Sequence, residues 1–151
     1  MVRFAQDCKV TEIDGYAFAD AIVLKSINIP SSVTTLHYQS FRGSWFTELV
    51  IPESVKNIEK SVFAFTECNA LENLTIKTKK EGSNVHSDVL IGLYDNGKDG
   101  DINLILDDSW FEPDAVNPNR QAKKNADGIG GTWMGQNFKS LKKLSEFSPQ
   151  P

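Results

Sequence analysis

A short segment that returns along the chain constrains the fold more than any other feature. Residues 24–36 read LKSINIPSSVTTL, and residues 46–58 read FTELVIPESVKNI. A third copy begins at residues 71–76 and loses the pattern at Lys77. The copies are about 22–25 residues apart, which is a spacing typical of solenoid repeats. One coil cannot bury its apolar side alone, so we expect stacked coils that share a continuous core.

Within each copy, apolar and polar residues alternate, as in Ile27, Asn28 and Ile29. This period predicts a half-buried strand. Pro30 and Pro52 follow the inward isoleucine and lack an amide N–H, so each strand is expected to end there. The strands of successive coils are then expected to lie side by side and parallel. The repeat aligns three inward columns, which are Val10, Val33 and Val55; Ile13, Leu36 and Ile58; and Phe18, Phe41 and Phe63.

The repeats resemble the BspA-type leucine-rich repeat, whose units read I-x-x-x-A-F-x-x-C-x-x-L-x-x-I-x-I-P-x-S-V. The resemblance covers residues 10–76 and implies a short solenoid of about three repeats with a C-terminal cap. It also implies surface-exposed or secreted proteins of an adhesion type. The residues that carry it are Ala17, Phe18, Leu24, Ile27, Ile29, Pro30, Ser32, Val33, Ile51, Pro52, Ser54, Val55, Cys68, Asn69, Ala70 and Leu71.

The predicted fold is α/β or mostly β: a right-handed leucine-rich-repeat stack with parallel strands, an inserted β-hairpin and a C-terminal cap. We expect a single domain over residues 1–151. Its expected parts are the repeats at residues 10–76, a loop and hairpin insertion at residues 77–110, and a capping segment at residues 111–151.

The insertion is predicted from two patterns. Residues 77–87 are mostly polar, which indicates a loop. The apolar runs at residues 88–94 and 102–106 flank Asn-Gly and Asp-Gly pairs, a pattern typical of a β-hairpin.

The capping segment is predicted to begin with a short helix. Asn117 and Pro118 suit its cap and first position, and Gly128 would end it. Residues 138–141 repeat the spacing of residues 24–27, so a last strand is expected to dock there. The apolar residues expected to close the stack are Trp133, Met134, Phe138, Leu141 and Leu144.

Composition narrows the class of partner. A net charge of -4 argues against a nucleic-acid partner, which usually faces a basic surplus. No run of apolar residues is long enough for a membrane span, and residues 1–7 hold no signal-peptide core. Cys8 and Cys68 occupy different repeat columns two coils apart, so we expect free thiols.

No metal, cofactor or phosphate site is predicted. The loop at residues 95–101 partly resembles a calcium loop, but Gly97 and Leu106 stand where oxygen ligands are required. The glycine cluster at residues 128–131 is interpreted as a turn, because no expected strand precedes it.

No catalytic residues are predicted either. His37 shares its repeat position with Asp14 and Glu59, which indicates a solvated outward turn. An enzyme with a site at the junction of repeats and hairpin stays as an alternative, and it would depend on His86, Asp107 and Asp108.

The leading hypothesis is a non-catalytic, adhesion-type module that binds a protein partner, at the cell surface or secreted by family resemblance. A structural spacer within a longer array is the alternative. Trp45 and Tyr38 stand in columns that need no aromatic residue for packing, and exposed aromatic residues are enriched at interfaces. The candidate binding residues are these two and the outward strand positions Ser26, Asn28, Glu48, Val50, Asn73 and Thr75. Residues 1–9 are too few to cover the N-terminal coil, so we expect either that the chain is a piece of a longer array or that it self-associates through this coil.

Overall fold

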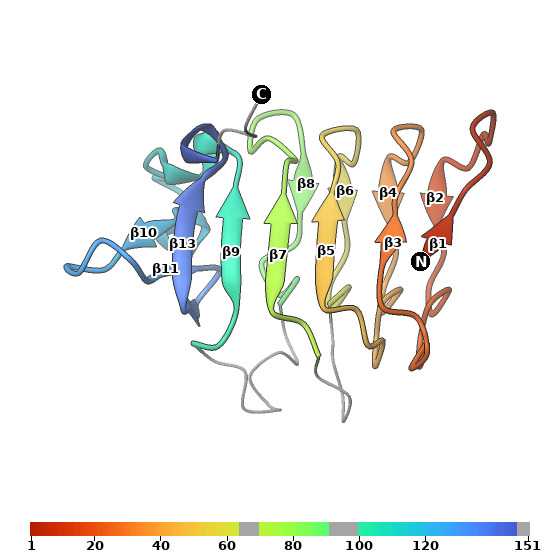
Figure 1. Cartoon of the computed structure of the whole chain (residues 1–151). Helices are drawn as coiled ribbons and strands as arrows, with labels where there is room; N and C mark the ends of the chain where they lie inside the picture. Colours follow the sequence, from red (N-terminus) through yellow and green to blue (C-terminus); the bar gives the residue numbers. More distant parts are fainter. Residues whose placement is uncertain (64–69, 91–99, 148–151) are drawn as a thin grey trace.

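The computed structural model describes residues 1–63, 70–90 and 100–147, and its strands form two facing layers (Figure 1). The front layer holds a parallel sheet in the order β13-β9-β7-β5. A parallel pair, β1 and β3, continues this layer beyond β5 (Figure 1). The bounds of its strands are β1 Val2–Arg3, β3 Ile27–Asn28, β5 Glu48–Ile51, β7 Asn73–Ile76, β9 Asn103–Leu106 and β13 Ser140–Lys143.

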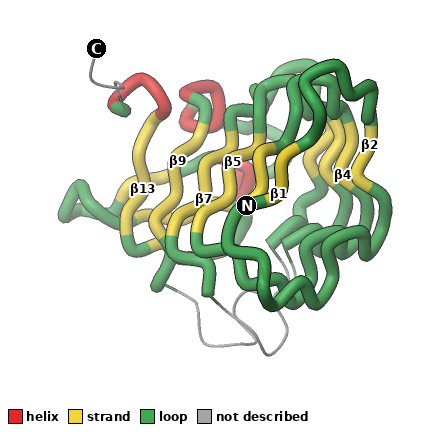
Figure 2. Tube along the Cα trace, turned by 45° about the vertical axis from the view of Figure 1, so that its right-hand side comes forward, coloured by secondary structure: helices red, strands yellow, loops and turns green. Residues whose placement is uncertain are grey.

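The back layer is a second parallel sheet in the order β2-β4-β6-β8. The chain alternates between the layers, and its coils wind in a right-handed sense (Figure 1). Figure 2 shows the two layers from another side, with the connecting turns stacked above and below them. The predicted solenoid of parallel strands is therefore confirmed. The bounds of the back strands are β2 Glu12–Ile13, β4 Thr35–Leu36, β6 Asn57–Ile58 and β8 Asn84–Val85.

The front strands follow the predicted alternation. In β5, Leu49 and Ile51 are fully buried, whereas Glu48 is exposed and Val50 is half-buried. The strand ends at Pro52, whose carbonyl accepts a hydrogen bond from the Val55 amide at 3.1 Å. Proline thus stops the ladder and starts the turn that leads to the back layer.

The inward columns predicted from the repeat form the core. The Phe18 and Phe41 rings stack at 5.8 Å between centroids, and Phe41 and Phe63 stack at 6.4 Å. Leu36 and Ile58 are buried in the back layer, one above the other in the register of β4 and β6. This repeated stacking joins successive coils into one core.

The predicted insertion at residues 77–110 is corrected by the structure. The expected loop contains β8, which extends the back layer with Val85 in the column of Ile58. Asn103–Leu106 is not a hairpin strand, because it pairs in parallel with both β7 and β13. Leu104 and Leu106 are buried, so the repeat core continues through this region. Residues 91–99, which include part of the first run and most of the tip of the expected hairpin, lie outside the described residues.

The antiparallel hairpin of this fold lies in the capping segment. The third sheet has the order β10-β11-β12 and consists of Lys123–Lys124, Gly131–Trp133 and Gln136–Phe138. Trp133 packs edge-on against Trp110 at 5.2 Å, and Trp133, Phe138 and Leu141 are buried. The last strand, β13, docks beside β9 as the spacing predicted.

The helix predicted from Asn117 is only one 3-10 turn, η2, at Pro118–Arg120. Asn117 caps it and proline takes the first position, as expected. It ends early because the Ala122 amide donates to the Trp110 carbonyl and the chain then enters β10. Two further 3-10 turns are η1 Asp108–Phe111 and η3 Leu144–Glu146. The described residues hold no α-helix, so the mostly β alternative is confirmed, and none of their helices could cross a membrane.

Candidate functional site

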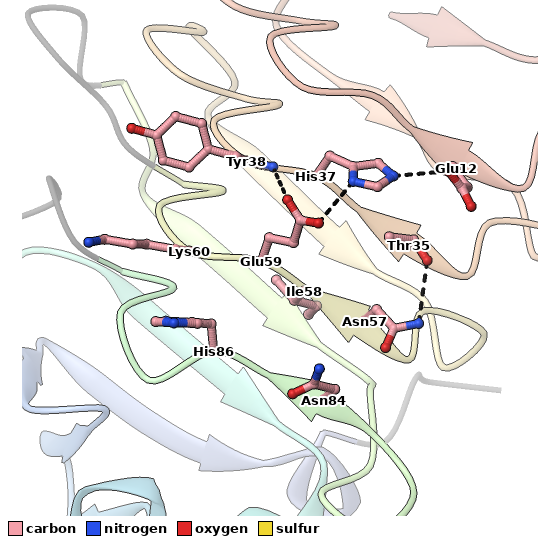
Figure 3. Close-up of a pocket in the computed structure, with 10 residues that line it drawn as sticks. All are labelled: Glu12, Thr35, His37, Tyr38, Asn57, Ile58, Glu59, Lys60, Asn84 and His86. Atoms are coloured by element: carbon pink, nitrogen blue, oxygen red, sulfur yellow. Dashed lines mark hydrogen bonds and ion pairs between the residues drawn. The ribbon is translucent and has the colours of Figure 1, made fainter.

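Hollows on both layers gather the chemistry-bearing side chains. The first, which we call the back pocket, has a volume of about 510 Å³ and lies over the ends of the back strands (Figure 3). The parallel register places equivalent residues of successive coils side by side there. The pocket is lined by Glu12, Thr35, His37, Tyr38, Asn57, Ile58, Glu59, Lys60, Asn84 and His86.

His37 lies between two carboxylates in this pocket (Figure 3). Its Nε2 is 2.9 Å from a Glu12 oxygen, and its Nδ1 is 3.0 Å from a Glu59 oxygen. The hydrogen bond with Glu12 raises the pKa of His37 above its ordinary value, and Glu59 raises it further against the opposing effect of burial. The second Glu59 oxygen accepts the Tyr38 amide at 2.8 Å. His37 is thus the central link between three successive coils.

Other polar groups of the back pocket hydrogen-bond to one another or to the backbone. The Asn57 amide donates to the Thr35 hydroxyl, and Nδ1 of His86 accepts from the Asp88 amide. The lining residues include no serine, cysteine or aspartate beside either histidine.

The second hollow, which we call the front groove, crosses the outward side of β5, β7 and β9 and has a volume of about 340 Å³. Val50, Thr75 and Ile105 form one row across it, because the register pairs these positions directly. A neighbouring hollow of about 620 Å³ over β1 and β3 shares Glu48, Val50 and Lys77 with the groove. The front groove is lined by Glu48, Val50, Asn73, Thr75, Lys77, Ile105, Leu144 and Phe147.

A second row on the front layer is held together by side-chain hydrogen bonds. The Asn103 amide donates to the Asn73 oxygen at 3.1 Å, and the Ser140 hydroxyl donates to the Asn103 oxygen at 2.8 Å. Asn73 and Asn103 are therefore positioned by their neighbours in adjacent coils.

The structure divides the eight candidate binding residues among three places. The six strand positions all line the two front hollows: Ser26, Asn28, Glu48, Val50, Asn73 and Thr75. Tyr38 lies at the back pocket, where its ring meets Tyr16 edge-on at 6.0 Å. Trp45 lies in the turn before β5, with the Lys25 ammonium 4.7 Å from its ring centroid.

The three residues of the enzyme alternative are not brought together. His86 follows β8 in the back layer, whereas Asp107 follows β9 in the front layer, and these layers run in opposite directions (Figure 1). Asp107 caps η1 by accepting from the Ser109 amide. Hydrogen bonds from the Ser145 side chain and backbone lower the pKa of Asp108, which disfavours a role as general acid.

Three further predictions concern the glycine cluster, the two cysteines and the calcium-like loop. The Asp127 carboxylate accepts from the Ile129 and Gly130 amides, so the glycine cluster contains a turn as expected. Cys8 is a free thiol, while Cys68 lies outside the described residues. The calcium-like loop at residues 95–101 also lies mostly outside them.

Sequence reasoning missed the residues that complete the front groove. Ile105, Leu144 and Phe147 were assigned to the insertion and the cap, so their place beside Val50 was not expected. The signal was present in Leu104 and Leu106, which alternate as Leu74 and Ile76 do. This alternation was not recognised as a further repeat, because the interval between these two pairs is longer than the interval between the earlier copies.

The BspA type leucine rich repeat region, in six copies, matches residues 3–88 of the chain. This match covers more than half of the sequence, and the described strands stack as the repeat requires. The chain belongs to the BspA-type leucine-rich-repeat family. Comparison with curated proteins and with solved structures found no match.

Proposed function

We propose that this chain is a non-catalytic protein-binding module whose front groove takes an extended segment of a partner protein. The observation that carries the proposal is the make-up of the groove. Half-buried Val50 and Ile105 lie in one row on a rigid parallel sheet, and exposed Phe147 lies at the same groove. Exposed apolar surface of this kind, rimmed by polar residues, marks interaction sites.

Two lysines at the groove favour a partner segment that carries an acidic group beside an apolar one, whereas Glu48, which also lines the groove, disfavours an acidic group next to itself. Lys77 lines the groove, and Lys142 pairs with Ile105 in the register of β13 and β9. Both lysines are exposed, and neither has an ion-pair partner among the described residues. An apolar side chain can contact Val50 and Ile105 while a neighbouring carboxylate meets one of these ammonium groups.

The family supports the non-catalytic part of the proposal. Leucine-rich-repeat proteins of this type are generally non-catalytic, and they are often associated with surface or secreted proteins. We therefore also propose an adhesion-type role at the cell surface or outside the cell. The alternative of a structural spacer differs in one respect, since a spacer needs no ligand on the front layer.

A random peptide library displayed on phage tests the proposal and does not require the partner to be identified first. We expect selection on the whole chain to enrich extended peptides with an acidic residue next to an apolar one. Ile105→Glu should weaken their binding by about tenfold or more, because it places a carboxylate in the apolar row. Lys77→Glu should weaken it as well, and each variant is checked for an unchanged melting curve.

The matched control is Asn84→Glu, which adds the same carboxylate at an exposed strand position of the back layer. It should leave peptide binding unchanged. Peptides that bind Ile105→Glu as well as they bind the unaltered chain would contradict the front groove as the site. Selection that enriches no peptide at all would favour the spacer.

A further inference from the structure

The back pocket holds a contact whose chemistry depends on protonation, and it lies on the layer opposite the proposed binding groove. Both ring nitrogens of His37 face a carboxylate oxygen, at 2.9 Å for Glu12 and 3.0 Å for Glu59. A neutral imidazole carries one N–H, so one of these contacts would then set a nitrogen lone pair against an oxygen. Only the imidazolium donates at both nitrogens. With both carboxylates ionised, this arrangement of acceptors fits a protonated His37.

The two carboxylates are not held equally. Glu59 also accepts the Tyr38 amide at 2.8 Å through its second oxygen. Glu12 has no side-chain hydrogen-bond partner other than His37 among the described residues. A neutral His37 that keeps its proton on Nδ1 retains Glu59 and loses Glu12. The contact with Glu12 is thus the one that deprotonation breaks.

Glu12 belongs to β2, which lies at one edge of the back layer. β2 is a two-residue strand, and its one strand neighbour among the described residues is β4. Besides the pairing of β2 with β4, the Thr34 amide donates to the Thr11 carbonyl and the His37 amide to the Ile13 carbonyl. The Ser32 and Thr34 hydroxyls donate to the Val10 and Thr11 carbonyls. The His37–Glu12 contact is a side-chain link between carboxylate and imidazole that adds to these bonds at the edge of the layer.

We propose that His37 is a pH-sensitive clamp that fastens β2 to the repeat stack: protonated, it holds Glu12 and Glu59 together, and deprotonated, it keeps Glu59 and releases Glu12. Other charged groups at the back pocket act on it less directly. Lys60 follows Glu59 and lies 3.9 Å from Asp88, and Asp14 accepts the Gly15 amide. His86, in the next coil, accepts the Asp88 amide.

The direction in which pH changes the stabilisation follows from the pKa of His37 in the folded chain. The pKa of His37 is raised above 6.5 in the folded chain, chiefly by Glu12. The stabilisation is then fully present below about pH 6.5 and is lost as the pH rises through the raised pKa. Release of β2 is expected on the alkaline side of that transition.

Nuclear magnetic resonance on the whole chain tests the clamp by two readouts. The sequence has 2 histidines, so His37→Gln removes one imidazole signal and assigns the other. We expect the pKa of His37 to lie above its ordinary value in the unaltered chain. In Glu12→Gln, this pKa should fall towards the ordinary value. Protection of the Thr34 and His37 amides from hydrogen exchange should fall by about two- to fivefold across the titration, as for loss of one partly exposed ion pair.

The matched control is Glu53→Gln, which removes another carboxylate paired at 2.9 Å, with Lys79. Lysine keeps its charge in this pH range, so this variant should retain the pH-dependent protection, whereas Glu12→Gln should lose it. A His37 imidazole that titrates at or below its ordinary pKa would overturn the clamp. Amide protection that stays constant through the titration of the unaltered chain would overturn it too.

Discussion

Neighbouring residues of β5 point to opposite sides of the front layer, and their energetic roles differ accordingly. Ile51 is fully buried, whereas Val50 is half-buried and lines the front groove. We expect Ile51→Ala to lower the free energy of unfolding by about 2–5 kcal/mol through the cavity it leaves. Val50→Ala should lower it by less than about 1 kcal/mol. Chemical denaturation of both variants measures the difference, and equal losses would mean that the strand register is wrong.

Gly131 in β11 is a position where a side chain has no room. A Cβ added there would meet the Leu141 side chain and the Lys123 carbonyl at 2.5 Å, because β11 lies between β10 and the buried side of β13. Gly131→Ala is therefore expected to destabilise the chain by about 1–3 kcal/mol through overpacking. Gly128→Ala adds the same methyl group in open space and controls for crowding, although its positive φ carries a smaller penalty of its own. Equal thermal shifts for the two variants would contradict the close approach at Gly131.

At the scale of single residues, the sequence predicts burial better than it predicts partners. The columns of Leu36, Ile58 and Phe41 repeat at a fixed spacing, so their inward direction could be inferred without coordinates. His37 was expected at a solvated outward turn, and it does lie on the outside of the back layer. Its contact with Glu12 could not be inferred, because Glu12 stands in a different column of the repeat and reaches His37 by its long side chain.

The C-terminal elements cover one end of the stack. β13 pairs with β9, and β11 and β12 place Trp133 and Phe138 in the core. Deletion of residues 130–151 removes these elements and leaves β9 as an uncovered edge with exposed apolar side chains. We expect the shortened chain to aggregate and to melt at a lower temperature. Size-exclusion chromatography with light scattering measures the first effect, and a monomer with unchanged melting would contradict the capping role.

At the scale of elements, regular spacing decided what could be predicted. The strands up to β7 recur at nearly constant intervals, and their place followed from the repeat. β8 and β9 come after longer intervals, so their apolar runs were interpreted as a loop and a hairpin. A local turn signal such as Asn-Gly does not reveal that the next strand pairs with a coil far back in the sequence. Parallel pairing of β9 with β7 and β13 is a property of the stack.

The end of the stack at β1 and β2 differs from the capped end. Each of these strands has one strand neighbour among the described residues. Unpaired strand edges pair readily with another chain, so self-association through this coil stays a prediction. Light scattering over a dilution series should show a mass that rises with concentration. A strict monomer at every concentration would contradict it.

The most direct test of the whole molecule is the set of inter-strand nuclear Overhauser contacts of Ile105. The proposed front groove requires one parallel front sheet through β5, β7, β9 and β13, because this sheet creates the row of residues that lines it. We predict backbone contacts of Ile105 with the neighbours of Thr75 on one side and of Lys142 on the other, in a parallel pattern. Antiparallel contacts between Ile105 and residues 88–94 would instead restore the inserted hairpin and contradict the continuous sheet.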